Sequence, residues 1–259
     1  IAFGVQRTFW RDGLGSWRLY LGPFNLSEGI HKIEYFSVDL RGNEEAHGFL
    51  DVAVDNTAPQ TSVAYSGPVL IPPFASDVGP EDRNALITSK TGIVLSAIDP
   101  VTQGVAVGVE NILYRVDSGA FQVYLGSFTL ASEGFHTIEY QSLDKLQNTE
   151  ALGTLRVAVD NTPPVNTITI GEPKRFIFGC INMISTFTPV GLSAIDPVYQ
   201  DTRSGVDRIL FKVEPSTSGA AGFQVYRGPF TLPQGTYLVT FKGVDRLGNE
   251  KPDNLTIAV

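Results

Sequence analysis

Apolar and polar residues alternate with a period of two along most of the chain. In the segment 135–143, one side carries His136, Ile138, Tyr140 and Ser142. This period predicts β-strands that bury one face. No long segment has the 3.6-residue period of an amphipathic helix, so we expect almost no helix.

One stretch of sequence occurs three times. EGIHKIEYFSVD at 28–39 returns as EGFHTIEYQSLD at 133–144 and as QGTYLVTFKGVD at 234–245. The blocks before these stretches also recur, as WRLYLGPF, FQVYLGSF and FQVYRGPF. The spacing of about one hundred residues is the size of a domain. The pattern therefore predicts repeated domains rather than one large domain.

Clusters of Gly, Pro, Asn and Asp separate the predicted strands. About seven short strands in one hundred residues are typical of an immunoglobulin-like sandwich of two antiparallel sheets. In the second copy we expect strands at 61–66, 93–98, 111–117, 121–125, 128–130, 135–143 and 154–159. The predicted fold is all-β, with tandem immunoglobulin-like β-sandwich domains at 1–57, 58–161 and 162–259.

The first of these domains is predicted to be incomplete. Residues 1–4 align with 105–108, so the first copy has no counterpart of the first two strands. Its sheet would have open edges, which invite pairing with another chain. Two explanations stay open. Either the chain is a window onto a longer tandem protein, or a neighbouring copy donates the missing strands in a head-to-tail assembly.

Composition argues against several classes of function. Hydrophobic residues make up 42% of the chain, which is enough for packed cores. The formal net charge of -8 gives no general attraction to phosphate backbones, so we expect no nucleic-acid partner. No stretch approaches the ~18 consecutive apolar residues of a membrane helix, and we expect no membrane insertion. One Cys and three His leave little for disulfide frameworks or histidine-based catalysis.

The ordered motifs point to a known family. YRVDSG, FQVYLGSF, EGFHTIEY and VDNTPP follow one another and resemble a bacterial extracellular immunoglobulin-like repeat. Such repeats recur in tandem in surface adhesins, fibres and large secreted enzymes, as spacers. The resemblance therefore implies an extracellular or cell-surface location and a non-catalytic structural or adhesive role, as a rod-like stalk or fibre segment. The alternative is a spacer or carbohydrate-binding region of a large secreted enzyme, with a surface glycan as partner.

The histidines and the cysteine are the first candidates for chemistry. His31 and His136 hold equivalent positions, and Tyr237 takes the same place in the third copy. Because a catalytic role would not tolerate this exchange, we expect the rings to close a sandwich corner by bonding to backbone. We expect His47 to be solvated in a loop and Cys180 to be a small buried hydrophobe. We predict no catalytic residue.

Carboxylates are the candidate metal ligands. In a sandwich of this topology, two loops of each domain face the last strand of the preceding domain. The acids expected to converge are Asp55, Asp99 and Asp144 at the first junction, and Asp160, Asp196 and Asp245 at the second. Such clusters can hold Ca²⁺, which would stiffen the hinge, and we expect no other cofactor. The alternative is turn chemistry, in which the carboxylates accept hydrogen bonds from nearby backbone N–H groups.

Two further regions are candidates for partner binding. The inserts 68–86 and 173–187 differ in composition on a fixed frame, and we expect the second to pack against a neighbouring molecule if it is exposed. Trp17 fits either a sugar-stacking platform or ordinary sheet packing. A carbohydrate site requires Trp17 to be exposed beside other rings.

Overall fold

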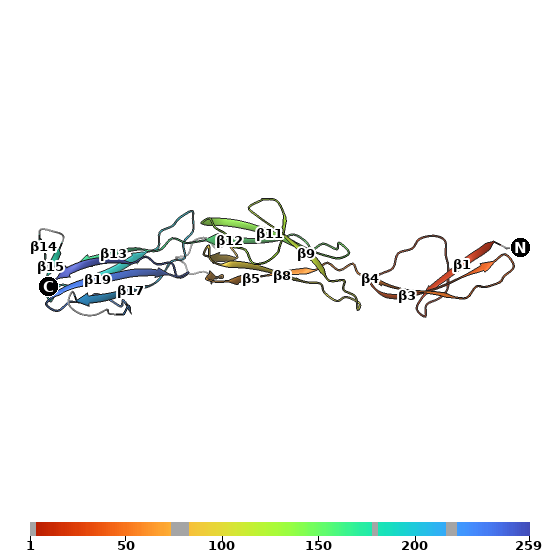
Figure 1. Ribbon diagram of the computed structural model, residues 1–259, viewed down its shortest axis with the longest axis horizontal. Coiled ribbons are helices and arrows are strands. Elements are labelled where there is room, and N and C mark those ends of the chain that lie inside the picture. The colour runs from red at the N-terminus through yellow and green to blue at the C-terminus, as the bar shows by residue number, and fades with distance from the viewer. Residues whose placement is uncertain (1–3, 74–82, 178–180, 216–221) are drawn as a thin grey trace.

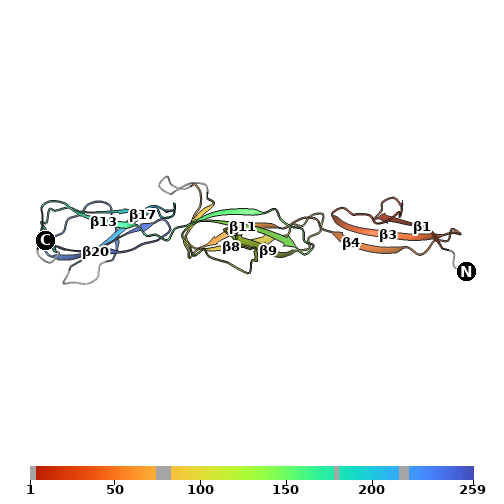
Figure 2. The same ribbon diagram turned by 90° about the horizontal axis from the view of Figure 1, so that it is seen from above.

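The computed structural model describes residues 4–73, 83–177, 181–215 and 222–259. All regular structure in these ranges is β-strand, and they contain no helix, so the all-β prediction is confirmed. The strands form three modules that follow one another along a single long axis (Figure 1). The view turned by 90° has the same extended outline, so the protein is a rod rather than a globule (Figure 2).

The first module is a single sheet. Its strands have the order β2-β1-β3-β4, and all neighbours are antiparallel. The long central strand of this sheet, β3, places His31 opposite Val52 of β4. The strands are β1 (Val5–Asp12), β2 (Arg18–Leu19), β3 (Gly29–Asp39) and β4 (Gly48–Val54).

The second module is a sandwich of two sheets. One sheet pairs β5 with β8, and the other has the order β10-β9-β11-β12-β7-β6. The strands are β5 (Gln60–Ser66), β6 (Val69–Leu70), β7 (Ala85–Ile87), β8 (Gly92–Ile98), β9 (Val109–Val116), β10 (Gln122–Val123), β11 (Gly134–Asp144) and β12 (Gly153–Val159).

The third module repeats the second strand for strand. One sheet pairs β13 with β16, and the other has the order β14-β15-β20-β19-β17-β18. The strands are β13 (Val165–Ile170), β14 (Lys174–Ile177), β15 (Ile181–Ile184), β16 (Val190–Ile195), β17 (Val206–Pro215), β18 (Gln224–Val225), β19 (Thr236–Asp245) and β20 (Asp253–Ala258).

The inward rows predicted from the alternation form the cores of both sandwiches. Ile138 on β11 and Val157 on β12 are fully buried in one cluster with Ile93 of β8. Val239 and Ile257 occupy the corresponding core of the third module. Burial of a side chain of this size stabilises the fold by roughly 1.5 to 3 kcal/mol, so these rows supply much of the driving force for each sandwich.

Two details of the strands differ from the prediction. Residues 128–130 form no strand, and Phe128 makes only an isolated bridge to Ile93. The prediction also lacks β6 and β7, and β7 shows no alternation because its three residues are all buried. It pairs in parallel with β12, and β15 pairs in the same way with β20. These short strands extend one sheet of each sandwich beside its last long strand.

The first module has one open face. Leu50 on β4 is 55% exposed, whereas its counterpart Leu155 on β12 is 7% exposed. No second sheet covers β1, β3 and β4 among the described residues. Trp10 is nevertheless buried, because its ring stacks on Phe24 with the centroids 3.7 Å apart. The open face is what an incomplete first sandwich predicts.

Candidate functional site

Each junction between modules repeats one polar contact. Asn148, in the turn after β11, donates from Nδ2 to the backbone carbonyl of Asp55 at 3.0 Å. Asn249, in the turn after β19, donates from Nδ2 to the backbone carbonyl of Asp160, also at 3.0 Å. Both carbonyls directly follow the last strand of the preceding module. Repeated sequence therefore builds the two junctions alike.

Apolar packing accompanies this contact at the second junction. Leu247, from the turn after β19, is buried in one cluster with Leu86 and Ala158 of the second module. The Thr202 hydroxyl donates to the backbone carbonyl of Val159 at 3.3 Å. These contacts bury the facing ends of the two modules and restrict bending between them.

The six predicted acidic residues meet at these junctions in two groups of three. In each group, one carboxylate oxygen from each residue lies within 4.8 Å of the others; the groups are Asp55, Asp99 and Asp144, and Asp160, Asp196 and Asp245. The second group is fully buried, whereas Asp99 of the first group is partly exposed. Carboxylate oxygens are the ligands that hard divalent cations prefer, so these groups are the candidate metal ligands.

Turn chemistry accounts for part of each group. The backbone N–H groups of Leu247 and Asn249 donate to Oδ1 of Asp245 at 2.9 and 2.7 Å, and Asn249 Nδ2 donates to Oδ2 at 2.8 Å. Asp144 accepts the same three bonds in the second module. Asp39 accepts them in the first module. The expected turn chemistry is therefore confirmed at these three positions.

Several buried oxygens remain without a hydrogen-bond partner in the described part of the chain. At the second junction these are Oδ2 of Asp160 and Oγ of Ser204, whose residues are 0% exposed, and Oδ1 of Asp196, which is 4% exposed. At the first junction Oδ1 of Asp99 is unpartnered, but Oδ2 of Asp55 accepts a bond from the backbone N–H of Val107 at 2.9 Å. A buried polar atom without a partner costs about 1–3 kcal/mol. The cost is therefore concentrated at the second junction.

Burial dominates the electrostatics of the second group. It raises the pKa of Asp160 to about 6, and the carboxylates of Asp196 and Asp245 add to the rise. The Ser204 hydroxyl lies beside Asp160 and opposes the rise, but the two form no well-aligned hydrogen bond. Burial also raises the pKa of Asp196, although the Gly205 N–H donates to its Oδ2 at 2.6 Å. Three ionised carboxylates at this spacing repel one another.

The histidine prediction is confirmed for His31 and His136. Nδ1 of His136 lies 2.6 Å from Oδ2 of Asp117, and Nε2 lies 3.0 Å from the backbone carbonyl of Ser132. His31 makes the same pair of contacts in the first module. In the third module the Tyr237 hydroxyl donates to a backbone carbonyl at 3.5 Å. Each ring closes a corner of its module.

Ser132, His136 and Asp117 form an array that the sequence pattern does not reveal. The Ser132 hydroxyl oxygen lies 3.2 Å from Nε2 of His136, which is the order of groups in a serine-hydrolase triad. The backbone carbonyl of Ser132 is the nearer partner of Nε2, and His31 has only the carbonyl contact with Ser27. We therefore interpret the array as a corner clamp rather than an activated nucleophile.

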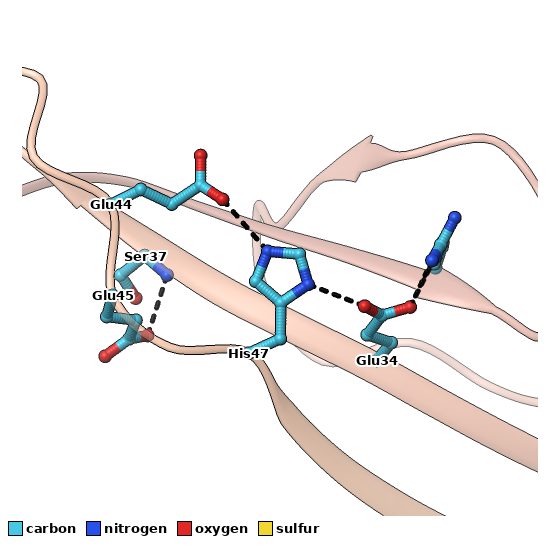
Figure 3. A network of polar contacts seen from close by, with 6 residues as sticks. Glu34, Ser37, Glu44, Glu45 and His47 are labelled. Atoms are coloured by element: carbon cyan, nitrogen blue, oxygen red, sulfur yellow. Dashed lines mark hydrogen bonds and ion pairs between the residues drawn. The ribbon is translucent and has the colours of Figure 1, made fainter.

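His47 lies in a loop and is exposed, as expected, but its ring also has partners that the expectation did not include. Its Nδ1 lies 2.6 Å from Oε1 of Glu34, and its Nε2 lies 2.9 Å from Oε1 of Glu44 (Figure 3). The ring also stacks on Phe36 with the centroids 4.5 Å apart. Glu34 is buried and accepts a second bond from Nε of Arg11 at 2.6 Å. Glu44 comes from the same loop, whereas Glu34 and Phe36 come from β3, so the loop sequence around His47 does not reveal these two.

Trp17 lies in the same cluster, exposed beside the rings of Phe36 and His47, which is the condition set for a carbohydrate site. It is 36% exposed, and the guanidinium of Arg11 lies over its ring at 4.5 Å from the centroid. Arg115 covers Phe121 in the same way in the second module, at 4.6 Å. Repeated cation–π packing therefore accounts for the position of Trp17 in the sheet, and a carbohydrate partner stays a prediction.

Other predicted positions are described only in part. Cys180 lies outside the described residues, and so do residues 74–82 of the insert 68–86. In the insert 173–187, Phe176 and Met183 are exposed on β14 and β15. The expectation that this insert packs against a neighbouring molecule stays a prediction.

No protein-family model matches the chain, and no curated protein matches it. Among solved structures, the chain is similar to the fibronectin(III)-like modules of Clostridium thermocellum CbhA, with 14% identity over 74% of this chain and 93% of that chain and a TM-score of 0.34. It is also similar to the FN1-FN3 domains of chicken CNTN1, with 10% identity over 98% of this chain and 91% of that chain and a TM-score of 0.32. It is similar to the D00-D0 domain of Intimin as well, with 12% identity over 76% of this chain and 100% of that chain and a TM-score of 0.26. Because these TM-scores are below 0.5, the fold assignment rests on the sheet topology.

The described residues contain no helix that is both long and apolar enough to span a membrane.

Proposed function

We propose that the chain is a non-catalytic structural segment of an extracellular bacterial surface protein, a rod that sets the distance between other parts of that protein. The end-to-end arrangement of the modules supports this proposal (Figure 1). β1 lies at one tip of the rod and the carboxyl end of the chain lies at the other, so length along the chain becomes distance in space. A net charge of -8 suits a hydrated outer surface.

The repetition of the junction carries the proposal. Asn148 and Asn249 make the same 3.0 Å bond to the preceding module, and each belongs to the same Asp-x-x-x-Asn turn. Flexibly linked domains need no such contact. A spacer of fixed reach needs one at every junction, because a single loose joint would make the reach variable.

The recurring polar side chains support a non-catalytic role. His136 holds its corner through Asp117 and the backbone, and the third module does the same with Tyr237. The turn acids Asp39, Asp144 and Asp245 hold backbone N–H groups. These repeated side chains bond to the backbone of their own module, which is a structural role.

The proposed location is tested by immunolabelling of intact bacterial cells that produce the natural protein, with an antibody raised against this chain. We expect labelling without permeabilisation, and we expect external protease to remove it. A cytoplasmic protein of the same cells is the control for lysis. Labelling that requires permeabilisation would contradict the extracellular location.

The open face of the first module favours a second role in assembly. In the second module the backbone N–H of Leu95 on β8 donates to the Tyr124 hydroxyl at 3.1 Å. Tyr20 is the counterpart of Tyr124, and it lines an apolar hollow with Trp10 and Phe24 on the open face. We propose that this face accepts an external β-strand whose apolar residues match those of β8, as in donor-strand complementation.

Light scattering over a range of concentrations tests whether a neighbouring copy supplies that strand. A mass that rises above 28.1 kDa with concentration, and that Tyr20→Arg returns to 28.1 kDa, supports head-to-tail assembly. A mass fixed at 28.1 kDa at every concentration contradicts donation by a second copy.

A further inference from the structure

We propose that the second junction binds Ca²⁺ through the carboxylates of Asp160, Asp196 and Asp245, and that the first junction binds it more weakly through its own three carboxylates. This inference goes beyond the proposed spacer role and does not depend on it, because modules can stack with or without an ion. The acidic group alone would not carry the inference. The buried, unpartnered oxygens within it are the second observation.

The unpartnered oxygens show what the site lacks. Asp160 and Asp196 each use one carboxylate oxygen to accept a backbone N–H, from Thr162 at 3.1 Å and from Gly205 at 2.6 Å. The other oxygen of each is buried and accepts nothing within the described chain. Backbone donors therefore fill one side of each carboxylate, and the Ser204 hydroxyl, itself buried without a well-aligned partner, lies beside Asp160. A cation that binds both free oxygens would remove their desolvation cost.

The charge of the site selects a cation of high charge. Three carboxylates lie together. Among the described residues, the cations beside them are Arg203, whose charge acts against the raised pKa of Asp196, and Arg246, which donates from Nη1 to the backbone carbonyl of Ser204 at 2.9 Å. Two arginines do not balance three carboxylates, and Nε of Arg203 is itself buried without a partner.

The ligand set fits Ca²⁺ by chemical class. All candidate ligands are oxygens, and Ca²⁺ accepts six to eight oxygens in flexible geometry, including water and carboxylates. Mg²⁺ demands near-ideal octahedral geometry and keeps its own water, which suits a buried group of three carboxylates less well. A surface hollow of about 260 Å³, lined by Asp196, Arg203 and Gly205, gives an ion a route to the group.

The two junctions differ in a way that ranks them. At the first junction the backbone N–H of Val107 fills Oδ2 of Asp55, and Asp99 is partly exposed to water. At the second junction the corresponding oxygen of Asp160, Oδ2, accepts no hydrogen bond, and Asp196 is buried. The second site therefore gains more from an ion. In both sites one ligand comes from the preceding module and two come from the next, so the ion would tie the modules together.

The test is isothermal titration of CaCl₂ into the chelator-treated full chain, with MgCl₂ as the parallel titrant. We expect the tighter site to have a Kd of about 0.1 to 1 mM, the range of extracellular Ca²⁺ modules. Mg²⁺ should bind more weakly. At a Ca²⁺ concentration one hundred times the Kd, the melting temperature should rise by roughly 10 °C relative to EDTA.

Two isosteric variants test the ligands. Asp160→Asn and Asp196→Asn each keep an oxygen for the backbone N–H and remove the charge, so each should weaken the tighter site about ten-fold or more. In EDTA, Asp196→Asn should melt higher than the wild-type chain, because it removes one of three repelling buried charges. Asp39→Asn is the control: it makes the same change at the counterpart of Asp245 in the first module, where the described residues form no acidic group, and Ca²⁺ affinity should not change.

Three results would overturn the proposal. The first is no Ca²⁺ binding up to about 10 mM with equal melting temperatures in Ca²⁺ and EDTA, which would assign the free oxygens to a shared proton. The second is Ca²⁺ affinity that survives in both Asp160→Asn and Asp196→Asn. The third is a melting temperature in EDTA that falls in Asp196→Asn, which would show that this carboxylate stabilises the junction by itself. None of these results bears on the length of the rod, which is measured separately.

Discussion

The side-chain amide of Asn249 donates to the backbone carbonyl of Asp160, and this 3.0 Å bond joins two modules across 89 positions of sequence. The same amide donates to Oδ2 of Asp245 at 2.8 Å and so also holds its own turn. Asn43 holds the equivalent turn of the first module through Oδ2 of Asp39 at 2.8 Å. Asn43 therefore shows the turn without the junction, and the two residues form a matched pair.

We expect Asn249→Ala to destabilise its module more than Asn43→Ala destabilises the first module. Both variants remove a turn bond, but Asn249→Ala also leaves the carbonyl of Asp160 without its partner at a buried junction. The additional loss should be about 1–3 kcal/mol. Hydrogen exchange of β19 and β3, followed by mass spectrometry, measures the two effects separately. Equal losses would show that the junction bond contributes nothing.

The His47 cluster predicts how the stability of the first module depends on pH. The bond to Glu34, followed by that to Glu44, raises the pKa of His47 above 6.5, and the bond from His47 is the largest cause that lowers the pKa of Glu34 below 4.5. A histidine whose pKa is raised by folding stabilises the fold fully below pH 6.5, and this stabilisation is lost as the pH rises through the folded pKa. A glutamate whose pKa is lowered by folding stabilises the fold fully above pH 4.5, and this stabilisation is lost as the pH falls through the folded pKa.

The cluster should therefore support the first module most between about pH 4.5 and 6.5. We expect the stability difference between wild type and His47→Gln to shrink as the pH rises from 6.5 through the folded pKa. Urea unfolding at a series of pH values measures it. His31, whose pKa is also raised, is present in both proteins and cancels from the difference, and Arg11 stays charged throughout. A difference that grows toward alkaline pH would contradict the predicted sign.

The corner clamp in the second module predicts unequal effects of two substitutions. His136→Ala removes the partner of both Asp117 and the Ser132 carbonyl, and it should lower stability by about 1–2 kcal/mol. Ser132→Ala leaves that carbonyl in place and should change stability by less than about 0.5 kcal/mol. A fluorophosphonate probe should not label the chain. Labelling that disappears in Ser132→Ala would contradict the clamp and indicate an activated serine.

The open face predicts that equivalent leucines differ in their energetic weight. Leu155→Ala creates a cavity between two sheets and should cost about 2–5 kcal/mol. Leu50→Ala removes a side chain that is mostly exposed and should cost less than about 1 kcal/mol. Urea unfolding of the two variants provides the comparison. A large loss for Leu50→Ala would mean that another strand covers this face in solution, as strand complementation requires.

Much of the fold follows from local pattern. The rows that contain Ile138 and Val157 are buried as the alternation predicts, because a strand with one packed face must alternate. β7 escapes the same reasoning, since it is buried on both faces and pairs in parallel with a distant strand. Phe128 shows the opposite error: an alternating, aromatic segment whose backbone makes only one bridge.

The sequence alone predicts which acidic residues form the candidate site, but not which of their oxygens accept hydrogen bonds. The order of the loops brings Asp160, Asp196 and Asp245 to one junction, because those loops meet at the same end of a sandwich. The two junctions differ because the backbone N–H of Val107 donates to Oδ2 of Asp55 at the first junction, whereas Oδ2 of Asp160 accepts no hydrogen bond at the second. No residue pattern encodes that difference. The contact between His47 and Glu34 was hidden for a similar reason, because the pairing of β3 with β4 brings the two residues together.

Small-angle X-ray scattering of the full chain tests the central claim, that fixed junctions hold three modules in one rod. The 11-residue strand β3 spans about 36 Å, so three modules in line should extend roughly 110 Å, with a radius of gyration of about 30 Å. A compact chain of 259 residues would have a radius of gyration of about 18 Å. We predict the larger value with a distance distribution typical of a rod. A value near 18 Å, or a distribution that fits only an ensemble of bent chains, would contradict the account.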